Sequence, residues 1–211
     1  MFNCTIYKSD KRTKHYYVYI DSSLIGILYR RDLEDLQLHI PCDGEKSEED
    51  VDERVHDKIW QMVEEHAYSK AVSILTVSEY CAKEIRTKLE MRRYSKEIID
   101  EVITQLYEIR YLDDERYAEA YIHTYAGRKS RDLIHRELEM KDIFLNNFDE
   151  IYNNVINDDG IDENELINNI LEKKFENYDL KDEKIKNRAV RYLSQRGFMV
   201  GEIIRQINKR Q

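Results

Sequence analysis

A short helical pattern occurs three times in this chain of 211 residues. Its apolar positions are first Ile85, Leu89 and Tyr94, then, 49 residues later, Ile134, Leu138 and Ile143, and, after a further 55 residues, Ala189, Leu193 and Phe198. A helical unit of about 45 residues buries too little apolar surface to fold alone, so such units stack on their neighbours. The triplication therefore predicts a repeat protein that presents a large surface to a partner.

The repeats divide the chain into four segments. We expect an N-terminal extension at 1–66, followed by helical repeats at 67–112, 113–161 and 162–211. Three helices are expected in each repeat, and in the first repeat they cover roughly 67–76, 78–92 and 95–110. The predicted fold is mainly α, with three tandem three-helix repeats that form an elongated curved body after a small α+β extension.

Several residues have the spacing or the chemistry of helix caps. Thr76 with Glu79, and Asp162 with Glu165, are three residues apart, as in a capping box. Ser95 is a favourable cap for the third helix of the first repeat. These residues predict where the helices of the repeats begin.

The N-terminal extension contains a predicted β-hairpin. The runs 15–20 and 24–29 are rich in β-branched and aromatic residues, and the polar residues 21–23 between them indicate a turn. Asp32 is then expected to cap a brief helix that reaches Leu38. A loop follows at 41–44, where Pro and Gly occur.

A helical period begins after this loop. Ser47 and Asp50 have capping-box spacing. The apolar residues that follow recur on one helical face: Val51, Val55, Ile59, Met62 and Val63. Trp60 lies beside this stripe, and we expect it to anchor the extension to the repeats.

The composition is typical of a soluble helical protein. Charged residues make up 36% of the chain, which has six Gly and one Pro, so little room is left for long loops. No apolar run reaches the ~18 residues of a membrane helix, and the first ten residues lack the layout of a signal peptide. Three widely separated cysteines, Cys4, Cys42 and Cys81, fit a reduced cytoplasmic protein without a metal cluster.

No catalytic or metal-binding motif is recognisable in the sequence. The six histidines lack ligand-pair spacing, and there is no Gly-rich phosphate loop, nucleophile elbow or Cys-x-x-Cys. Asp113, Asp114 and Glu115 form an acidic cluster, but consecutive acids at a helix start satisfy free N–H groups and do not converge on one ion. We therefore expect no enzyme activity, no cofactor and no metal.

Four motifs in the repeats resemble the RecX family of bacterial RecA regulators. In chain order they are Glu84-Ile85 with Lys88-Leu89 and Tyr94, then Tyr111-Leu112-Asp113-Asp114-Glu115-Arg116-Tyr117-Ala118, then Ile134 with Glu137-Leu138 and Lys141, and finally Tyr192-Leu193 with Arg196-Gly197-Phe198. The resemblance covers about 67–211. It implies a non-enzymatic, monomeric regulator that binds the groove of the RecA filament on single-stranded DNA. Such a regulator restrains ATP hydrolysis, strand exchange and filament growth in recombinational repair and the SOS response.

Three positions depart from the family pattern. Glycines expected after helices are Arg93, Arg110 and Asp142 here, whereas Gly197 keeps the usual residue. Glycine is favoured there because the position after a helix end often has φ > 0. We expect these turns either to tighten differently or to be held by packing, at a cost of ~1 kcal/mol each.

Basic residues at equivalent repeat positions are the candidate contacts with a partner or with nucleic acid. Together with further arginines of the third repeat they are Arg92, Arg136, Lys141, Arg188, Arg191, Arg196 and Arg205. A ladder formed by Arg92, Lys141 and Arg196 would suit an acidic RecA surface or a phosphate backbone. Lys and Arg in a last helical turn also complement the helix dipole, so a capping role, which predicts the same register, is the alternative interpretation.

A direct DNA-binding regulator is the competing hypothesis, because paired helices with short turns imitate a helix-turn-helix. The net charge of −9 opposes it, whereas eight bases and one acid between Lys184 and Arg210 favour a nucleic-acid contact. In the predicted hairpin, strand alternation directs at least one of Tyr16, Tyr17 and Tyr19 outward. The hairpin is therefore a second candidate contact surface, where aromatic rings stack on bases.

Overall fold

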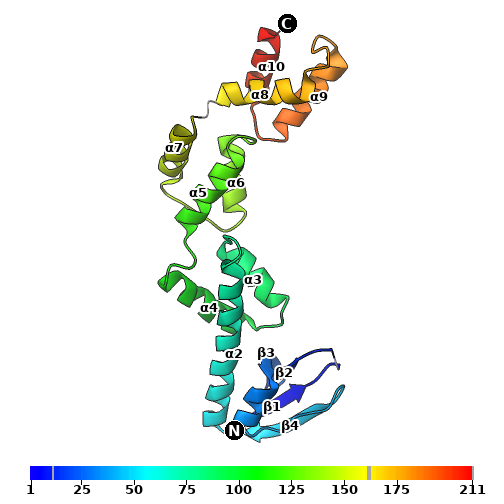
Figure 1. Cartoon of the computed structure of the whole chain (residues 1–211), viewed down its shortest axis with the longest axis vertical. Coiled ribbons are helices and arrows are strands. Elements are labelled where there is room, and N and C mark those ends of the chain that lie inside the picture. Colours follow the sequence, from blue (N-terminus) through cyan, green and yellow to red (C-terminus); the bar gives the residue numbers. More distant parts are fainter. Residues whose placement is uncertain (11, 161–162, 211) are drawn as a thin grey trace. The chain divides into compact units, whose positions relative to one another are not determined.

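The structure is a computed structural model that describes residues 1–10, 12–160 and 163–210. The chain divides into two compact units, an N-terminal unit, Met1–Asp113, and a C-terminal unit, Asp114–Gln211. The described residues are mainly helical, with one small sheet near the N-terminus, as the sequence predicts (Figure 1). The elongated curvature and the four-segment division stay predictions, and the predicted cap Asp162 lies outside the described residues.

The sheet of the N-terminal unit has four antiparallel strands. They are β1 (Phe2–Tyr7), β2 (His15–Ile20), β3 (Ser23–Tyr29) and β4 (Lys46–Val51), in the order β3-β2-β1-β4. The predicted hairpin is confirmed as β2 and β3. Asp21 and Ser22 join these strands with φ of 46° and 68°, the positive values typical of a tight two-residue hairpin turn.

Strand β4 contradicts the prediction that Ser47 and Asp50 start a helix. Lys46–Val51 pairs with β1 along the edge of the sheet, with Ser47 and Val51 buried and Asp50 exposed. Charged side chains are common on edge strands because they discourage pairing with another chain. The local charge pattern imitates a helix start, but pairing with the distant β1 decides the conformation.

Two helices begin just after strands of the sheet, and neither begins at the residue that the sequence predicts. Helix α1 (Arg30–Asp35) begins before Asp32 and ends before Leu38, so Asp32 is not its first cap. The Asp32 carboxylate instead reaches back from inside the helix and accepts the Tyr29 N–H at 2.6 Å. Helix α2 (Glu53–Leu75) begins after Asp52, whose carboxylate accepts the Val55 N–H at 2.8 Å.

Helix α2 is continuous across the predicted boundary between extension and first repeat. It ends at Leu75 with Thr76 as its C-terminal cap, so the predicted helix start at Thr76 and Glu79 is wrong. The next helix, α3 (Ala82–Glu90), begins after Cys81, whose N–H donates to Glu84 Oε2 at 3.1 Å. The capping residue therefore lies five positions later than the sequence suggests, because residues 76–81 form the connection between α2 and α3.

Trp60 joins α2 to α4 (Lys96–Glu108), as predicted for an anchor between extension and repeat. Its indole N–H donates to Glu101 Oε2 at 2.9 Å, while the half-buried ring packs on the core. Ser95 caps α4 as expected, because its hydroxyl accepts the Ile98 N–H at 3.3 Å. Buried residues from the sheet, α2, α3 and α4 form one hydrophobic cluster in this unit.

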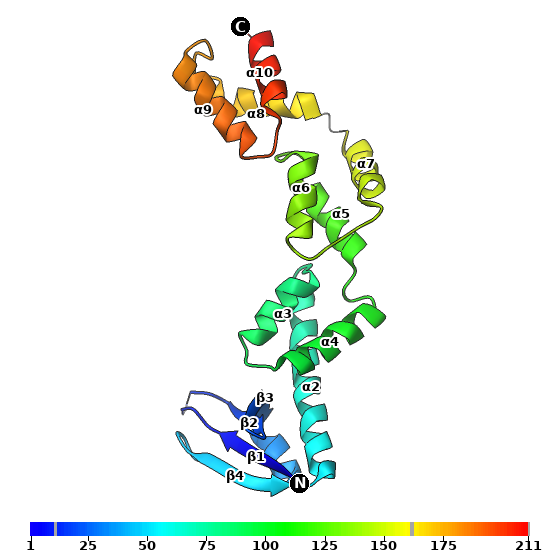
Figure 2. The ribbon, with the colours of Figure 1, turned by 180° about the vertical axis from the view of Figure 1, so that it is seen from behind.

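The C-terminal unit contains the remaining helices. They are α5 (Asp114–Tyr125), α6 (Arg131–Glu139), α7 (Phe148–Asp159), α8 (Glu163–Phe175), α9 (Glu183–Ser194) and α10 (Val200–Lys209) (Figure 2). Buried side chains of α8, α9 and α10 form a hydrophobic cluster of their own. Throughout the described part of the chain, no helix is both long and apolar enough to cross a membrane.

The same turn closes the second helix of each repeat. The N–H groups of Tyr94, Ile143 and Phe198 donate to the carbonyl oxygens of Leu89, Leu138 and Leu193 at 3.4, 3.0 and 3.3 Å. All six side chains are buried. The residue before each donor has a positive φ: 68° at Arg93, 64° at Asp142 and 87° at Gly197. The repeat register read from the sequence is therefore confirmed at these turns.

The predicted strain at the non-glycine turns is also visible in the backbone. Arg93, Asp142 and Arg110 (φ 57°) all adopt the left-handed conformation that costs ordinary residues energy. The turns have not tightened differently. Hydrogen bonds hold all three turns in the geometry that glycine prefers, and at Arg93 and Asp142 the residue that follows is also buried.

Gly197 also allows the second and third repeats to pack closely. A Cβ atom at this position would lie 2.3 Å from Ser130 Oγ and 2.6 Å from Leu133 Cβ. Next to it, the Ser130 N–H donates to the Arg196 carbonyl oxygen at 2.9 Å. The turn after α9 thus docks onto the start of α6 through a contact that leaves no room for a side chain.

Gly197→Ala is expected to destabilise the C-terminal unit by about 2 kcal/mol or more, since it combines a left-handed alanine with a steric clash. Gly201→Ala is the matched control, because Gly201 lies in α10 with nothing within 4 Å of an added Cβ. This control should gain about 0.5–1 kcal/mol of stability from helix propensity. Urea unfolding followed by circular dichroism compares the two, and equal midpoints would contradict the proposed packing.

Arg93→Gly is expected to stabilise the N-terminal unit by up to about 1 kcal/mol, because glycine adopts φ > 0 without the steric cost of a side chain. Arg93→Ala removes the same exposed side chain but keeps the strained backbone, and should leave stability nearly unchanged. The thermal midpoints of the three proteins provide the measurement. A gain in the alanine variant equal to that in the glycine variant would show that the side chain, not the backbone, carries the cost.

Candidate nucleic-acid interface

Arginines at the ends of the second helices bond to their own helix. Arg92 Nη1 donates to the Lys88 carbonyl oxygen at 2.7 Å, and Arg196 Nη1 donates to the Tyr192 carbonyl oxygen at 3.3 Å. Each acceptor lies four residues earlier, where the last carbonyls of a helix lack backbone partners. This geometry is what the capping interpretation expects. Each guanidinium carries five N–H donors, so one such bond leaves capacity for a further contact.

Lys141 holds the equivalent position in the second repeat but has a different environment. Its Nζ lies 5.7 Å from the ring centres of both Tyr117 and Tyr121 in α5, a distance typical of a cation–π contact. Arg136 lies in α6, and its Nε donates to the Asp132 carbonyl oxygen at 3.3 Å. The alignment of Arg92, Lys141 and Arg196 along one side of the protein stays a prediction.

Arg196 lines an open cleft of about 540 Å³ in the C-terminal unit. Arg128 from the loop before α6, and Lys173 and Lys174 from the last turn of α8, also line it. Glu165 is the one acidic side chain among the lining residues that the structure describes. The cleft therefore gathers positive charge from three segments that are far apart in the sequence, and such a surface attracts anionic groups.

An aromatic ring contributes to the same cleft. The guanidinium carbon of Arg196 lies 3.7 Å from the ring centre of Tyr192, a close cation–π contact. The planar arginine fork matches phosphate and carboxylate geometry. We name the lining residues Arg128, Lys173, Lys174, Tyr192 and Arg196 the basic cleft.

The sequence predicted one of the cationic residues of the basic cleft, Arg196. Lys173 and Lys174 are recognisable in the sequence as a pair of adjacent basic residues. They do not occupy the positions in the second helix of each repeat that predict the candidate contacts. Arg128 lies in the loop between α5 and α6, so it belongs to no helical pattern that can be compared between repeats. Tertiary packing of the loop, α8 and α9 creates the cleft, and repeat register alone does not reveal it.

The other predicted residues of the third repeat lie in varied surroundings. Arg188 and Arg191 are exposed in α9, and the Arg188 guanidinium lies 5.6 Å from the ring centre of Tyr178. Arg205 in α10 forms an ion pair with Glu202 at 3.0 Å. The structure therefore brings Arg196 into a basic cleft, whereas the charge of Arg205 is partly balanced by its neighbour.

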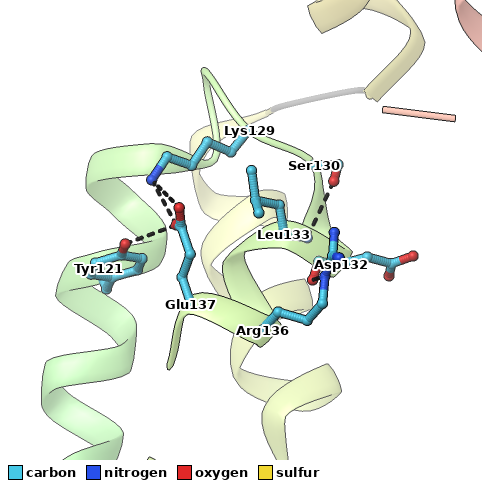
Figure 3. A network of polar contacts seen from close by, with 7 residues as sticks. All are labelled: Tyr121, Lys129, Ser130, Asp132, Leu133, Arg136 and Glu137. Carbon is cyan, nitrogen blue, oxygen red and sulfur yellow. Dashed lines mark hydrogen bonds and ion pairs between the residues drawn. The ribbon is translucent and has the colours of Figure 1, made fainter. Parts of the chain in front are cut away.

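A polar network fixes the position of α6 beside α5 (Figure 3). Lys129 Nζ donates to both oxygens of Glu137 at 2.8 and 2.6 Å, and the Tyr121 hydroxyl donates to Glu137 Oε2 at 2.8 Å. The Lys129 ammonium group also lies 3.9 Å from the ring centre of Tyr125. Glu137 thus acts as the acceptor that joins the two helices and the loop between them.

The same network changes the titration of a tyrosine. Burial, followed by the hydrogen bond to the Glu137 carboxylate, raises the pKa of Tyr121 well above the ordinary tyrosine value. Within residues 1–10, 12–160 and 163–210, no three His, Cys, Asp or Glu side chains converge in a way that would hold a metal ion.

Comparison with known proteins identifies relatives for most of the chain. Residues 67–106 match a family described as "RecX, first three-helix domain". The chain is similar to "Regulatory protein RecX" of Mannheimia succiniciproducens, with 33% identity over 135 residues that cover 63% of this chain and 86% of the relative. The "Regulatory protein RecX" of Clostridium tetani is 31% identical over 156 residues, which cover 70% of each chain.

The fold is also found in a solved structure. The chain of "Crystal structure of regulatory protein RecX" superposes with a TM-score of 0.56 at 18% identity, covering 96% of this chain and 97% of that one. At 18% sequence identity, this similarity is evidence for a shared fold alone. The mainly helical architecture with a small N-terminal sheet is therefore one that a known regulatory protein also adopts.

Alkaline pH is expected to weaken the C-terminal unit through Tyr121. A tyrosine whose pKa is higher in the folded than in the unfolded chain stabilises the fold fully below the unfolded value of about 10, and this contribution is lost as the pH rises above it. Tyr121→Phe should cost about 1 kcal/mol near neutral pH through the lost hydrogen bond, and should show a smaller decline in stability towards about pH 11.

Urea unfolding midpoints across this pH range provide the measurement. Tyr178→Phe removes an exposed hydroxyl elsewhere in the same unit and should follow the unmodified protein. Parallel curves for the Tyr121 variant and the unmodified protein would show that the hydroxyl of Tyr121 does not carry the pH dependence.

Proposed function

Since this chain belongs to the RecX family of regulatory proteins, we propose that it binds the RecA filament on single-stranded DNA and restrains its activity. The regulated activities are ATP hydrolysis, strand exchange and filament growth during recombinational repair and the SOS response. The protein acts in the cytoplasm as a monomer, and it acts by binding and not by catalysis. The observation that carries the proposal is the sequence match to regulatory relatives over two thirds or more of their length.

The basic cleft supports a filament as the partner. A nucleoprotein filament is rich in phosphate groups, and a cleft with four cationic side chains and one acid is electrostatically complementary to them. The whole protein carries a net charge of −9, so this complementarity is local. At physiological ionic strength the screening length is about 8 Å, and a local cluster therefore dominates over the distant acids.

Direct DNA binding without RecA is the second candidate function. The basic cleft and the basic segment from Lys184 to Arg210 favour it, and helix pairs joined by short turns are compatible with it. The acidic protein as a whole opposes tight binding to free DNA. A gel-shift titration without RecA separates the hypotheses, since nanomolar, sequence-dependent binding would favour the direct regulator.

Purified protein is expected to lower the ATPase rate of RecA on single-stranded DNA at protein-to-RecA ratios up to equimolar. Inhibition should depend on salt, because it uses charged contacts. The measurement is a coupled ATPase assay at several salt concentrations. An unchanged rate across this range would contradict the proposed function.

Charge reversal in the basic cleft provides a sharper form of this experiment. Arg196→Glu and Lys173→Glu should each raise the half-inhibiting concentration several-fold while helix content is preserved. Lys181→Glu is the matched control, because Lys181 is exposed between α8 and α9 and does not line the cleft. Equal effects of cleft and control variants would assign inhibition to net charge instead of to this surface.

A further inference from the structure

The N-terminal unit contains an open pocket that the family resemblance does not explain. It has a volume of about 520 Å³, within the ~300–1,000 Å³ range of sites that hold small ligands. Strands β2 and β3, the middle of α2 and the turn after α3 line it. Both views of the ribbon show the sheet and α3 on the same side of α2 (Figures 1 and 2).

Aromatic side chains line the sheet side of the pocket. Tyr17 is half-buried, and its ring meets His15 edge-on at 5.1 Å between ring centres. Tyr29 is 41% exposed and meets the ring of His66 edge-on at 4.8 Å. Tyr17 also has Tyr7 as a stacked neighbour, at 6.3 Å between ring centres, so Tyr29 is the more exposed of the two rings. Aromatic faces of this kind stack on nucleic-acid bases regardless of sequence.

Positive charge lines the opposite side of the same pocket. Lys70 comes from α2, and Arg92 comes from the turn after α3. No Asp or Glu is among the lining residues in the described part of the chain, although acids outnumber bases by 43 to 34 in the whole sequence. The bond from Arg92 Nη1 to the Lys88 carbonyl oxygen fixes one edge of the guanidinium. The pocket thus pairs stacking surfaces with phosphate-binding groups.

We infer that this pocket binds single-stranded nucleic acid, with a base stacked against Tyr17 and Tyr29 and the backbone phosphates held by Lys70 and Arg92. The inference rests on the proposed function in one respect, because the single strand of nucleic acid that the pocket binds is the one in the RecA filament. It adds a second contact in a different unit from the basic cleft. It also gives the N-terminal hairpin, which was predicted to offer an outward tyrosine, a specific role.

Binding of a labelled oligothymidylate to the full chain without RecA tests the inference by fluorescence anisotropy. Arg92→Glu should weaken binding about fivefold or more, whereas Arg93→Glu, the same charge change on an adjacent residue that does not line the pocket, should have a much smaller effect. The measurement is made at about 0.15 M salt, where screening separates local from distant charge.

A second pair of variants tests the aromatic contact. Tyr29→Leu should weaken binding about fivefold or more, because base stacking on an aromatic ring is lost. Tyr111→Leu is its control, since Tyr111 is 43% exposed in the same unit but lies outside the pocket. Circular dichroism confirms that all four variants keep the helix content of the unmodified protein.

Two outcomes would overturn the inference. They are no oligonucleotide binding by the unmodified protein, and equal effects within both variant pairs. In the first case, loss of RecA inhibition by Arg92→Glu would assign the pocket to a protein segment. The proposed function is tested separately, and it is contradicted if the unmodified protein leaves the RecA ATPase rate unchanged. The inference is supported, whatever the ATPase result, if the unmodified protein binds the oligonucleotide, both pocket variants weaken this binding and both control variants retain it.

Discussion

The left-handed turn after the second helix of each repeat is the constraint on which the packing of this protein depends. In each turn the N–H of a buried residue donates to the carbonyl of a buried leucine five positions earlier, as Tyr94 does to Leu89. The chain therefore reverses within a few residues, and the side chain after the turn returns to the core. Where Arg93 and Asp142 replace glycine, this burial offsets the cost of a positive φ.

Two of these turns, the first and the third, also contact a neighbouring segment of the chain. The Ser95 N–H after the first turn donates to the Ile25 carbonyl oxygen of β3 at 3.0 Å, and the Ser130 N–H at the start of α6 donates to Arg196 in the third turn. Each contact has a glycine beside it. A Cβ at Gly26 would lie 2.4 Å from Val63 Cγ1, as one at Gly197 would clash with Ser130. At both junctions the glycine therefore allows a neighbouring side chain, that of Val63 or of Ser130, to approach the backbone closely.

Two clefts in this acidic protein combine cationic groups with tyrosine rings. They are the basic cleft of the C-terminal unit and the pocket of the N-terminal unit that Tyr17, Tyr29, Lys70 and Arg92 line. Arg196 and Arg92 hold equivalent repeat positions, and one lines each cleft. Their bonds to the preceding helix carbonyls make capping and ligand contact compatible, because a guanidinium has donors for both. The two interpretations that the sequence left open therefore do not exclude each other.

The sequence by itself determined the helical repeats, the hairpin and the left-handed turn positions, because these depend on local periodicity and on residues close in the chain. Only the tertiary structure decided that Lys46–Val51 is a strand, since its partner β1 lies some forty residues away and its charges resemble a helix start. Tertiary packing likewise determined the basic cleft, in which a loop residue, Arg128, meets the Lys173-Lys174 doublet and Arg196. Repeat register identifies equivalent positions, but it carries no information on which loops approach them.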